Sequence, residues 1–170
     1  MLSQLTVKLV GKQIMTHTAP PMRSGLHYYL EQQFNSFHNF PIETDLDKLD
    51  ADIAIIGIPF GDPYSMGEAS NDQAFAPTHV RKHCGRALRG LDRYDFDIGG
   101  TLLDGKNIKV VDCGDVVGVA KDLAGNHGRS EQAIRKILAS GALPIIIGGD
   151  HAIPIPVLRA YEGRGPITLI

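Results

Sequence analysis

The part of the chain best suited to chemistry is the motif Gly148-Gly149-Asp150-His151. It follows the apolar run 143–147, which is typical of a buried strand in a parallel sheet. Ligands of open α/β sheets bind beyond the carboxyl ends of such strands, and the two glycines let the backbone turn sharply there. A histidine at that place can bind a metal ion, while the neighbouring aspartate fixes its orientation or tautomer. The motif indicates a metal site, although a purely structural Asp–His pair is a common alternative.

Two further pairs of polar residues could border such a site. Asp112 and Asp115 follow a second apolar run and could act as paired carboxylates in acid–base chemistry. Ordering of a turn after the strand is the favoured interpretation, because such turns need Asp side chains anyway. Asn126 and His127 are expected in a loop before a helix, where they could lie at the site entrance. Since a single histidine cannot hold a metal ion by itself, the identity of the other ligands stays open.

His79 and His83 are four residues apart on an expected helix, a spacing that can bind a metal ion. No glutamate follows in the pattern of zinc-dependent proteases, and the charged residues Arg81 and Lys82 lie between the two histidines. A solvated helix face is therefore the favoured interpretation.

Alternation of apolar strands with helices predicts a doubly wound α/β fold with a parallel sheet. Strands are expected at residues 52–57, 108–112, 143–147 and 167–170. The segment 93–103 alternates polar and apolar residues, which predicts an irregular strand or a hairpin.

Three helices are expected between or after these strands. The first begins at 76–77, with a proline in its first turn. Its buried stripe is expected to consist of Val80, Cys84 and Leu88. The second helix is expected to be capped by Ser130 and ended by Gly141. Its apolar face is expected to consist of Ala133, Ile134, Ile137 and Leu138. The third helix is expected around residues 155–161.

The composition, with 43% hydrophobic and 21% charged residues, is typical of a soluble globular protein. A net charge of -2 and a pI near 6.4 argue against partners such as nucleic acid or an anionic membrane. No apolar run approaches the roughly 20 residues that a membrane-spanning helix needs. Cys84 and Cys113 lie far apart and indicate reduced thiols in a cytoplasmic protein.

The N-terminal region has an unusual composition. The first thirty residues contain no Asp or Glu, as in many organelle transit peptides. Arginine is scarce there, however, and Pro20-Pro21 breaks any helix. We therefore expect residues 1–44 to form a partly disordered N-terminal arm and residues 45–170 to form the α/β domain.

Four segments, in order, resemble the ureohydrolase family, which contains the arginases and agmatinases. Residues 52–59 are similar to the family's first strand and its Gly-Ile-Pro turn. The residues similar to its Arg-Phe-Gly-Pro and Ile-Arg segment are Phe75, Pro77, Val80 and Arg81. Residues 112–116 are similar to its Asp-x-Gly-Asp turn, and residues 148–151 to its first metal-binding motif. The resemblance covers about residues 45–170.

The resemblance implies a three-layer, parallel-sheet arginase-like fold that is truncated after about half of the domain. It also implies hydrolysis of a guanidino compound, agmatine or a related guanidino acid, to urea and an amine, by two Mn²⁺ ions that activate a bridging water. His151 would be a metal ligand, whereas the family's other ligand motifs would fall beyond Ile170. We therefore expect an incomplete site and no activity of this chain alone, in an enzyme that is a homo-oligomer when intact. Ala76 and residues 71–73 depart from the family pattern and leave the substrate open.

Two interpretations from other classes are alternatives. A product of 170 residues without catalysis could act as an interaction or decoy subunit, and an unrelated α/β domain could bind a nucleotide. Gly148-Gly149 lacks the later glycine and lysine of a P-loop, which argues against phosphate binding.

Overall fold

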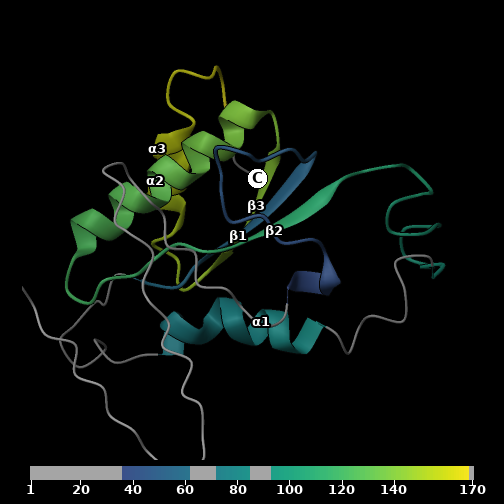
Figure 1. The fold of residues 1–170 in the computed structure, drawn as a ribbon, viewed down its shortest axis with the longest axis horizontal. Helices are drawn as coiled ribbons and strands as arrows, with labels where there is room; N and C mark the ends of the chain where they lie inside the picture. Colours follow the sequence, from purple (N-terminus) through teal and green to yellow (C-terminus); the bar gives the residue numbers. More distant parts are fainter. Residues whose placement is uncertain (1–35, 62–71, 85–92, 169–170) are drawn as a thin grey trace, which may run out of the picture.

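The computed structural model describes residues 36–61, 72–84 and 93–168. Within these segments the backbone forms a three-stranded parallel sheet in the order β2-β1-β3 (Figure 1). The strands are β1 Ile53–Ile58, β2 Val110–Asp115 and β3 Leu143–Gly148. The helices are α1 Ala76–Cys84, α2 Leu123–Ser140 and α3 Pro154–Ala160, with the short 3₁₀ helices η1 Phe37–Asn39 and η3 Asp72–Phe75. The predicted parallel α/β architecture is confirmed.

The sheet separates two helical layers. In Figure 1, α2 and α3 lie on one side of the strands and α1 lies on the other. Alternate residues of β1 explain this division, because successive side chains of a strand point to opposite faces. Ala54, Ile56 and Ile58 share the main core cluster with Ile134 and Ile137 of α2, and all five are fully buried. The hydrophobic core therefore lies mainly between the sheet and α2.

β1 and β3 lie where the sequence predicts them, but the prediction for β2 was partly wrong. β2 continues through Asp115, so the Asp-Cys-Gly-Asp motif lies inside the strand and not in a turn after it. The pairing of β1 with β2 shifts register between Ile55 and Gly57, and Gly114 adopts a φ of 74°. Glycine tolerates this left-handed backbone. The strand therefore continues through a local distortion, although the Asp-Cys-Gly-Asp sequence is typical of a turn.

The prediction for the start of α2 was wrong. The helix begins directly after Asp122, whose side chain accepts a hydrogen bond from the backbone N–H of Gly125 at 3.0 Å. Ser130 lies inside the helix, and its hydroxyl donates to the carbonyl oxygen of Asn126 at 2.9 Å. Gly125 and Gly128 lower the helix propensity of the first turns of α2, so these turns do not resemble a helix in the sequence. Ser130 follows them and is a residue type that N-caps prefer. The sequence therefore favoured the wrong capping residue.

The other predictions for α2 and α3 are confirmed. Gly141 ends α2 in the left-handed conformation, with a φ of 88°. The predicted apolar face packs into the core, with Ala133, Ile134 and Ile137 fully buried and Leu138 packed against them. α3 lies within one residue of its predicted bounds. Among the helices of the described segments, none is long and apolar enough to cross a membrane.

α1 begins where the sequence predicts, but its buried face is not the predicted one. Val80 is 42% exposed, and Leu88 lies outside the described residues. The buried residues are Pro77 and Arg81. The apolar stripe was expected from the four-residue spacing of Val80, Cys84 and Leu88, and charged residues are almost never fully buried unless they are paired. Arg81 is the exception, because it faces carboxylates of β2 that are described below.

The segment before β1 follows the outer edge of β2. Ile42 forms an isolated parallel bridge with Asp112, whose backbone N–H donates to the carbonyl oxygen of Pro41 at 2.8 Å. Residues 36–44 of the predicted arm thus lie against the sheet, while residues 1–35 lie outside the described segments. The boundary between arm and domain stays a prediction.

Two further sequence expectations concern peripheral segments. The segment 93–103 contains an antiparallel bridge between Asp95 and Gly100, as the hairpin alternative predicts, and it projects away from the sheet (Figure 1). Of the expected strand 167–170, residues 167 and 168 have no regular structure, and residues 169–170 lie outside the described segments. That strand is therefore untested.

The capping residue of α2 gives a direct test of where the helix starts. Asp122→Ala removes the acceptor for the Gly125 N–H and an ion pair with Arg129 at 3.1 Å. We expect the free energy of unfolding to fall by about 1 kcal/mol. Ser130→Ala should change it by no more than about 0.5 kcal/mol, because alanine is the better residue inside a helix. Urea unfolding of both variants measures the difference, and a larger loss in Ser130→Ala would place the cap at Ser130.

Candidate functional site

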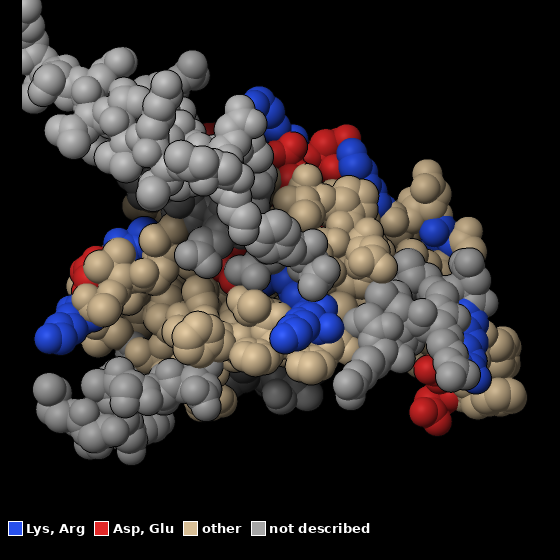
Figure 2. All heavy atoms as spheres, turned by 60° about the horizontal axis from the view of Figure 1, so that its bottom comes forward, with Lys and Arg blue, Asp and Glu red and all other residues tan. Residues whose placement is uncertain are grey.

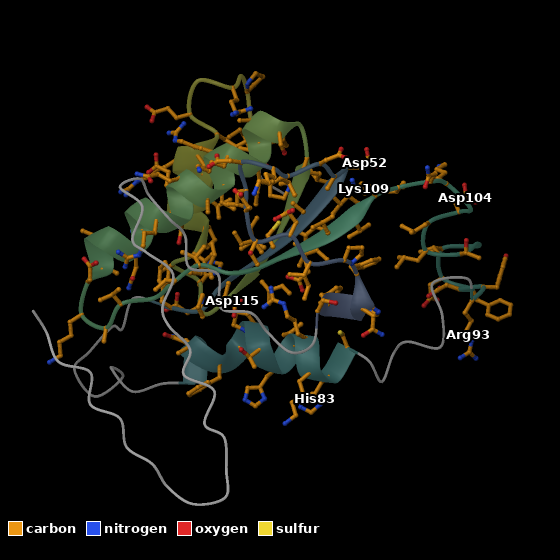
Figure 3. All side chains as sticks on the ribbon, viewed as in Figure 1. Asp52, His83, Arg93, Asp104, Lys109 and Asp115 are labelled. Atoms are coloured by element: carbon orange, nitrogen blue, oxygen red, sulfur yellow. The ribbon has the colours of Figure 1, made fainter. Side chains whose placement is uncertain are left out.

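The carboxyl ends of the three strands meet at one edge of the sheet. Gly57 of β1 pairs with Ile147 of β3 on one side and with Asp115 of β2 on the other. Figure 3 shows Asp115 at this edge beside α1, and Asp52 and Lys109 at the opposite end of the strands. Because ligands of parallel sheets bind beyond the carboxyl ends of the strands, this edge is the candidate site.

The loop after β3 packs closely against the loop after β1. A Cβ atom at Gly149 would lie 2.3 Å from the carbonyl oxygen of Phe60, so only glycine allows this approach. The ring of Phe60 in turn lies beside the ring of His127 in α2, with the ring centroids 6.1 Å apart. Gly148 is less restricted, since its Cβ would lie 3.1 Å from the side chain of Ile153. Gly149 therefore fixes the path of the turn that leads to the candidate metal ligand.

Asp150 holds the loop that carries His151. One carboxylate oxygen, Oδ1, accepts from the backbone N–H of Ala152 at 2.9 Å. The other, Oδ2, accepts from the side-chain amide of Gln73 at 3.0 Å. Gln73 belongs to η3, within the segment that departs from the ureohydrolase pattern. His151 is exposed at the carboxyl end of β3, which leaves its ring accessible to an ion or a substrate.

A buried charge cluster lies between α1 and β2. The guanidinium of Arg81, a residue that is 2% exposed, donates to both carboxylate oxygens of Asp112, from Nε at 2.8 Å and from Nη2 at 2.9 Å. It also donates to Oδ1 of Asp115 and, at 2.9 Å, to the carbonyl oxygen of Gly114. Such bidentate, charge-assisted hydrogen bonds are among the strongest in proteins. The single side chain of Arg81 thus ties α1 to the end of β2.

The cluster keeps Arg81 charged. Burial alone would lower the pKa of Arg81, but the hydrogen bonds and charges of Asp112 and Asp115 outweigh it and raise the pKa above its ordinary value. Asp112 also accepts from the backbone N–H groups of Phe37 at 2.7 Å and Gly114 at 2.9 Å. Asp112 thus holds the backbone and both carboxylates are engaged by Arg81, which favours an ordering role over acid–base catalysis.

Cys113, between the two aspartates, is no better placed for nucleophilic chemistry. It is fully buried, and this burial raises the pKa of its thiol to about 12. The nucleophile of a cysteine is the thiolate, so Cys113 stays an unreactive thiol near neutral pH.

Asn126 and His127 lie in the first half of α2 rather than in the predicted loop. Asn126 accepts from the backbone N–H of Val119 at 2.8 Å and donates to its carbonyl oxygen at 2.9 Å. Both Asn126 and His127 are buried, with exposed fractions of 7% and 9%. Asn126 holds the chain before α2, and the ring of His127 lies beside Phe60 in the loop after β1. That the two residues border the site stays a prediction.

The sequence assigns no structural role to two residues that organise this edge, although Arg81 belongs to the ureohydrolase-like segment. The sequence places Arg81 at a solvated helix face and Gln73 in a divergent segment. The sequence did contain a signal for the burial of Arg81. Asp112 and Asp115 follow an apolar run, and carboxylates on a buried strand require a positively charged or hydrogen-bonding partner. For Gln73 the sequence contains no such signal, because its contact with Asp150 depends on how two distant loops meet.

The described residues do not form a complete metal site. In the segments 36–61, 72–84 and 93–168, no group of three or more His, Cys, Asp or Glu side chains could hold a metal ion. Asp112 and Asp115 are engaged by Arg81. His151 supplies one imidazole, and a single donor does not fit a pair of manganese ions.

Removal of the buried cation tests the role of the cluster. Arg81→Met leaves two buried carboxylates without their partner, and we expect the free energy of unfolding to fall by about 3–5 kcal/mol. Lys82→Met is the matched control, because Lys82 is the exposed neighbour on the same helix and should change stability by less than about 0.5 kcal/mol. Chemical denaturation measures both variants, and equal stability would show that the carboxylates do not depend on Arg81.

The contact between the two loops gives a second test. Gly149→Ala forces the Phe60 carbonyl away, and we expect a loss of about 1–3 kcal/mol in unfolding free energy. Gly128→Ala is the control, since its Cβ inside α2 would meet nothing within 4 Å. That change should stabilise the protein by about 0.5–1 kcal/mol. Thermal unfolding compares the variants, and an unchanged stability of Gly149→Ala would refute the close approach.

Comparison with known proteins identifies relatives of this chain. The Arginase family profile matches residues 51–170. The mitochondrial agmatinase of Gallus gallus is 31% identical over 176 residues, which covers 97% of this chain and 48% of that protein. The mitochondrial guanidino acid hydrolase of Homo sapiens is 30% identical over 137 residues, which covers 79% of this chain and 36% of that protein. The chain thus spans about half, or less, of the length of these curated relatives.

A solved structure shares the fold. The crystal structure of a hypothetical agmatinase from Burkholderia thailandensis matches with a TM-score of 0.61 and 23% identity, covering 84% of this chain and 44% of that chain. Its likeness agrees with the parallel sheet and its two helical layers. The match over residues 51–170 and the identity to agmatinase along nearly the whole chain show that the chain belongs to the arginase family.

Proposed function

We propose that this chain is part of a ureohydrolase that cleaves a guanidino compound, agmatine or a related guanidino acid, into urea and an amine. The observation that carries the proposal is the placement of His151, exposed at the carboxyl end of β3 on a loop that Gly149 and Asp150 fix. The names of two relatives, an agmatinase and a guanidino acid hydrolase, support the substrate class.

The proposal includes two Mn²⁺ ions, with His151 as one of their ligands. Imidazoles and carboxylates suit this ion, and a bound water would supply the nucleophile when the site is complete. The described residues do not complete such a site by themselves. Two properties of His151 support this part of the proposal: its imidazole nitrogen is a metal donor, and the residue is exposed.

The other residues of the edge position His151 rather than react. Asp150 accepts from Ala152 and Gln73 and so holds the loop in place. Arg81 fixes the end of β2 through its bonds to both aspartates, and β2 is paired with β1, whose following loop contacts Gly149. A ligand held by several such contacts keeps its geometry when ions or substrates exchange.

Three further parts of the proposal rest on the sequence. We propose a homo-oligomeric assembly, as the resemblance implies, and a cytoplasmic location. We also propose that neither nucleic acid nor a membrane is a partner, because the chain carries a net charge of -2 and lacks a strongly basic character.

A chimaera tests the proposed function. This chain replaces the matching part of the Gallus gallus agmatinase, to which it is 31% identical. We expect Mn²⁺-dependent release of urea from agmatine, guanidinobutyrate or guanidinopropionate, measured by a colorimetric assay for urea. The 170-residue chain assayed alone with Mn²⁺ is the negative control, because its described residues supply no complete metal site.

Matched variants of the chimaera make the result specific to His151. His151→Ala should abolish urea release, whereas Lys82→Ala on the outer side of α1 should leave it unchanged. Thermal unfolding shows whether each chimaera is folded. A folded chimaera that releases no urea from any of the guanidino compounds, arginine included, would contradict the proposal and favour a non-catalytic interaction or decoy subunit.

A further inference from the structure

The outer face of α1 carries two histidines that the fold turns away from the sheet. Pro77 and Arg81 take the buried side of the helix, so His79 and His83 fall on its opposite side. Both histidines are exposed, and Figure 3 shows His83 on the side of α1 that faces away from the strands. The solvated face predicted for these two residues is confirmed.

The two imidazole rings already form a pair. They are stacked, with ring centroids 6.2 Å apart and planes 9° from parallel. The ring of Phe75 packs edge-on against His79, with centroids 6.4 Å apart, which restricts that ring further. Two separate contacts thus hold the rings on one side of the helix.

The positively charged side chains near His79 and His83 would repel a bound metal ion only weakly. Arg81, which lies between the histidines in sequence, is buried and engaged by Asp112 and Asp115. Figure 2 brings this side of the molecule forward and shows mostly neutral side chains with separate groups of Lys and Arg. The nearest cation in sequence that stays at the surface is Lys82, whose long side chain can extend away into solvent.

The centroid spacing of the pair is near that of a chelate, and rotation of the two exposed rings would have to turn one nitrogen of each toward the ion. Two imidazoles at positions i and i+4 of a helix can bind one metal ion. With Zn–N bonds of about 2.0–2.1 Å and a tetrahedral angle, the ring centroids would lie about 5 Å apart, which is about 1 Å closer than the observed 6.2 Å. Small changes of the side-chain torsions supply this closure.

We propose that His79 and His83 form a binding site for a borderline divalent transition-metal ion, Zn²⁺ in the first place and Ni²⁺ or Cu²⁺ by the same chemistry, with water in the remaining positions. Imidazole suits these ions, whereas oxygen ligands suit Mn²⁺. The site is therefore separate from the proposed manganese site in position and in metal preference, and it does not depend on the ureohydrolase proposal. A bound ion bridges successive turns of α1 and holds them helical.

Titration with Zn²⁺ tests this inference. The full 170-residue chain is purified without a histidine tag, and isothermal titration calorimetry measures binding. We expect one Zn²⁺ per chain, with the affinity reduced by about tenfold or more in His79→Ala and in His83→Ala, because the second ring binds as an intramolecular ligand. In NMR spectra, the ring signals of His79 and His83 should shift together on addition of Zn²⁺.

Controls separate this site from other histidines. Lys82→Ala should keep the Zn²⁺ affinity of the unchanged chain, and Mn²⁺ should not shift the two ring signals. His79 and His83 are exposed on a helix, where alanine is tolerated, and circular dichroism checks that each variant folds. The same Zn²⁺ affinity in the double variant His79→Ala/His83→Ala, or shifts at other histidines instead, would overturn the inference.

Discussion

The buried ion pairs of Arg81 are the interaction on which the arrangement of this chain depends. Asp112 and Asp115 lie in β2, whose residues are all buried, and a carboxylate in such a place is costly without a partner. Arg81 supplies that partner from α1, and the N–H of Phe37 completes the hydrogen bonding of Asp112. Three segments that are distant in sequence therefore meet at one point. Because burial of charges carries a desolvation cost, the cluster specifies this arrangement more than it adds net stability.

A chain of contacts leads from this cluster to His151. Asp115 pairs with Gly57 at the end of β1, and the loop after β1 places the carbonyl of Phe60 against Gly149. Gln73, which precedes α1, donates a further hydrogen bond to Asp150. An exposed histidine thus receives its position from half-buried neighbours. This is the contribution that the described residues make to the proposed metal site.

The sequence predicted those features that local patterns determine and missed those that depend on distant partners. Apolar runs identified β1 and β3, and Gly141 identified the end of α2, because burial and left-handed caps leave signals within a few residues. Ser130 was the wrong cap, since Asp122 lies before glycines that hide the helical pattern. Of the candidate site, the motif at His151 was visible from its spacing. The burial of Arg81 was not, because it follows from carboxylates on another element.

Nuclear magnetic resonance of the Arg81 guanidinium measures most directly whether Arg81 joins α1 to β2. Hydrogen bonds to Asp112, Asp115 and Gly114 should restrict rotation of the two Nη groups and shield the Nε proton from water. The predicted result is separate Nη signals and slow proton exchange for Arg81, in contrast to the averaged signals of the exposed Arg159. Averaged signals and fast exchange for Arg81, like those of Arg159, would contradict the buried cluster and the edge that is built on it.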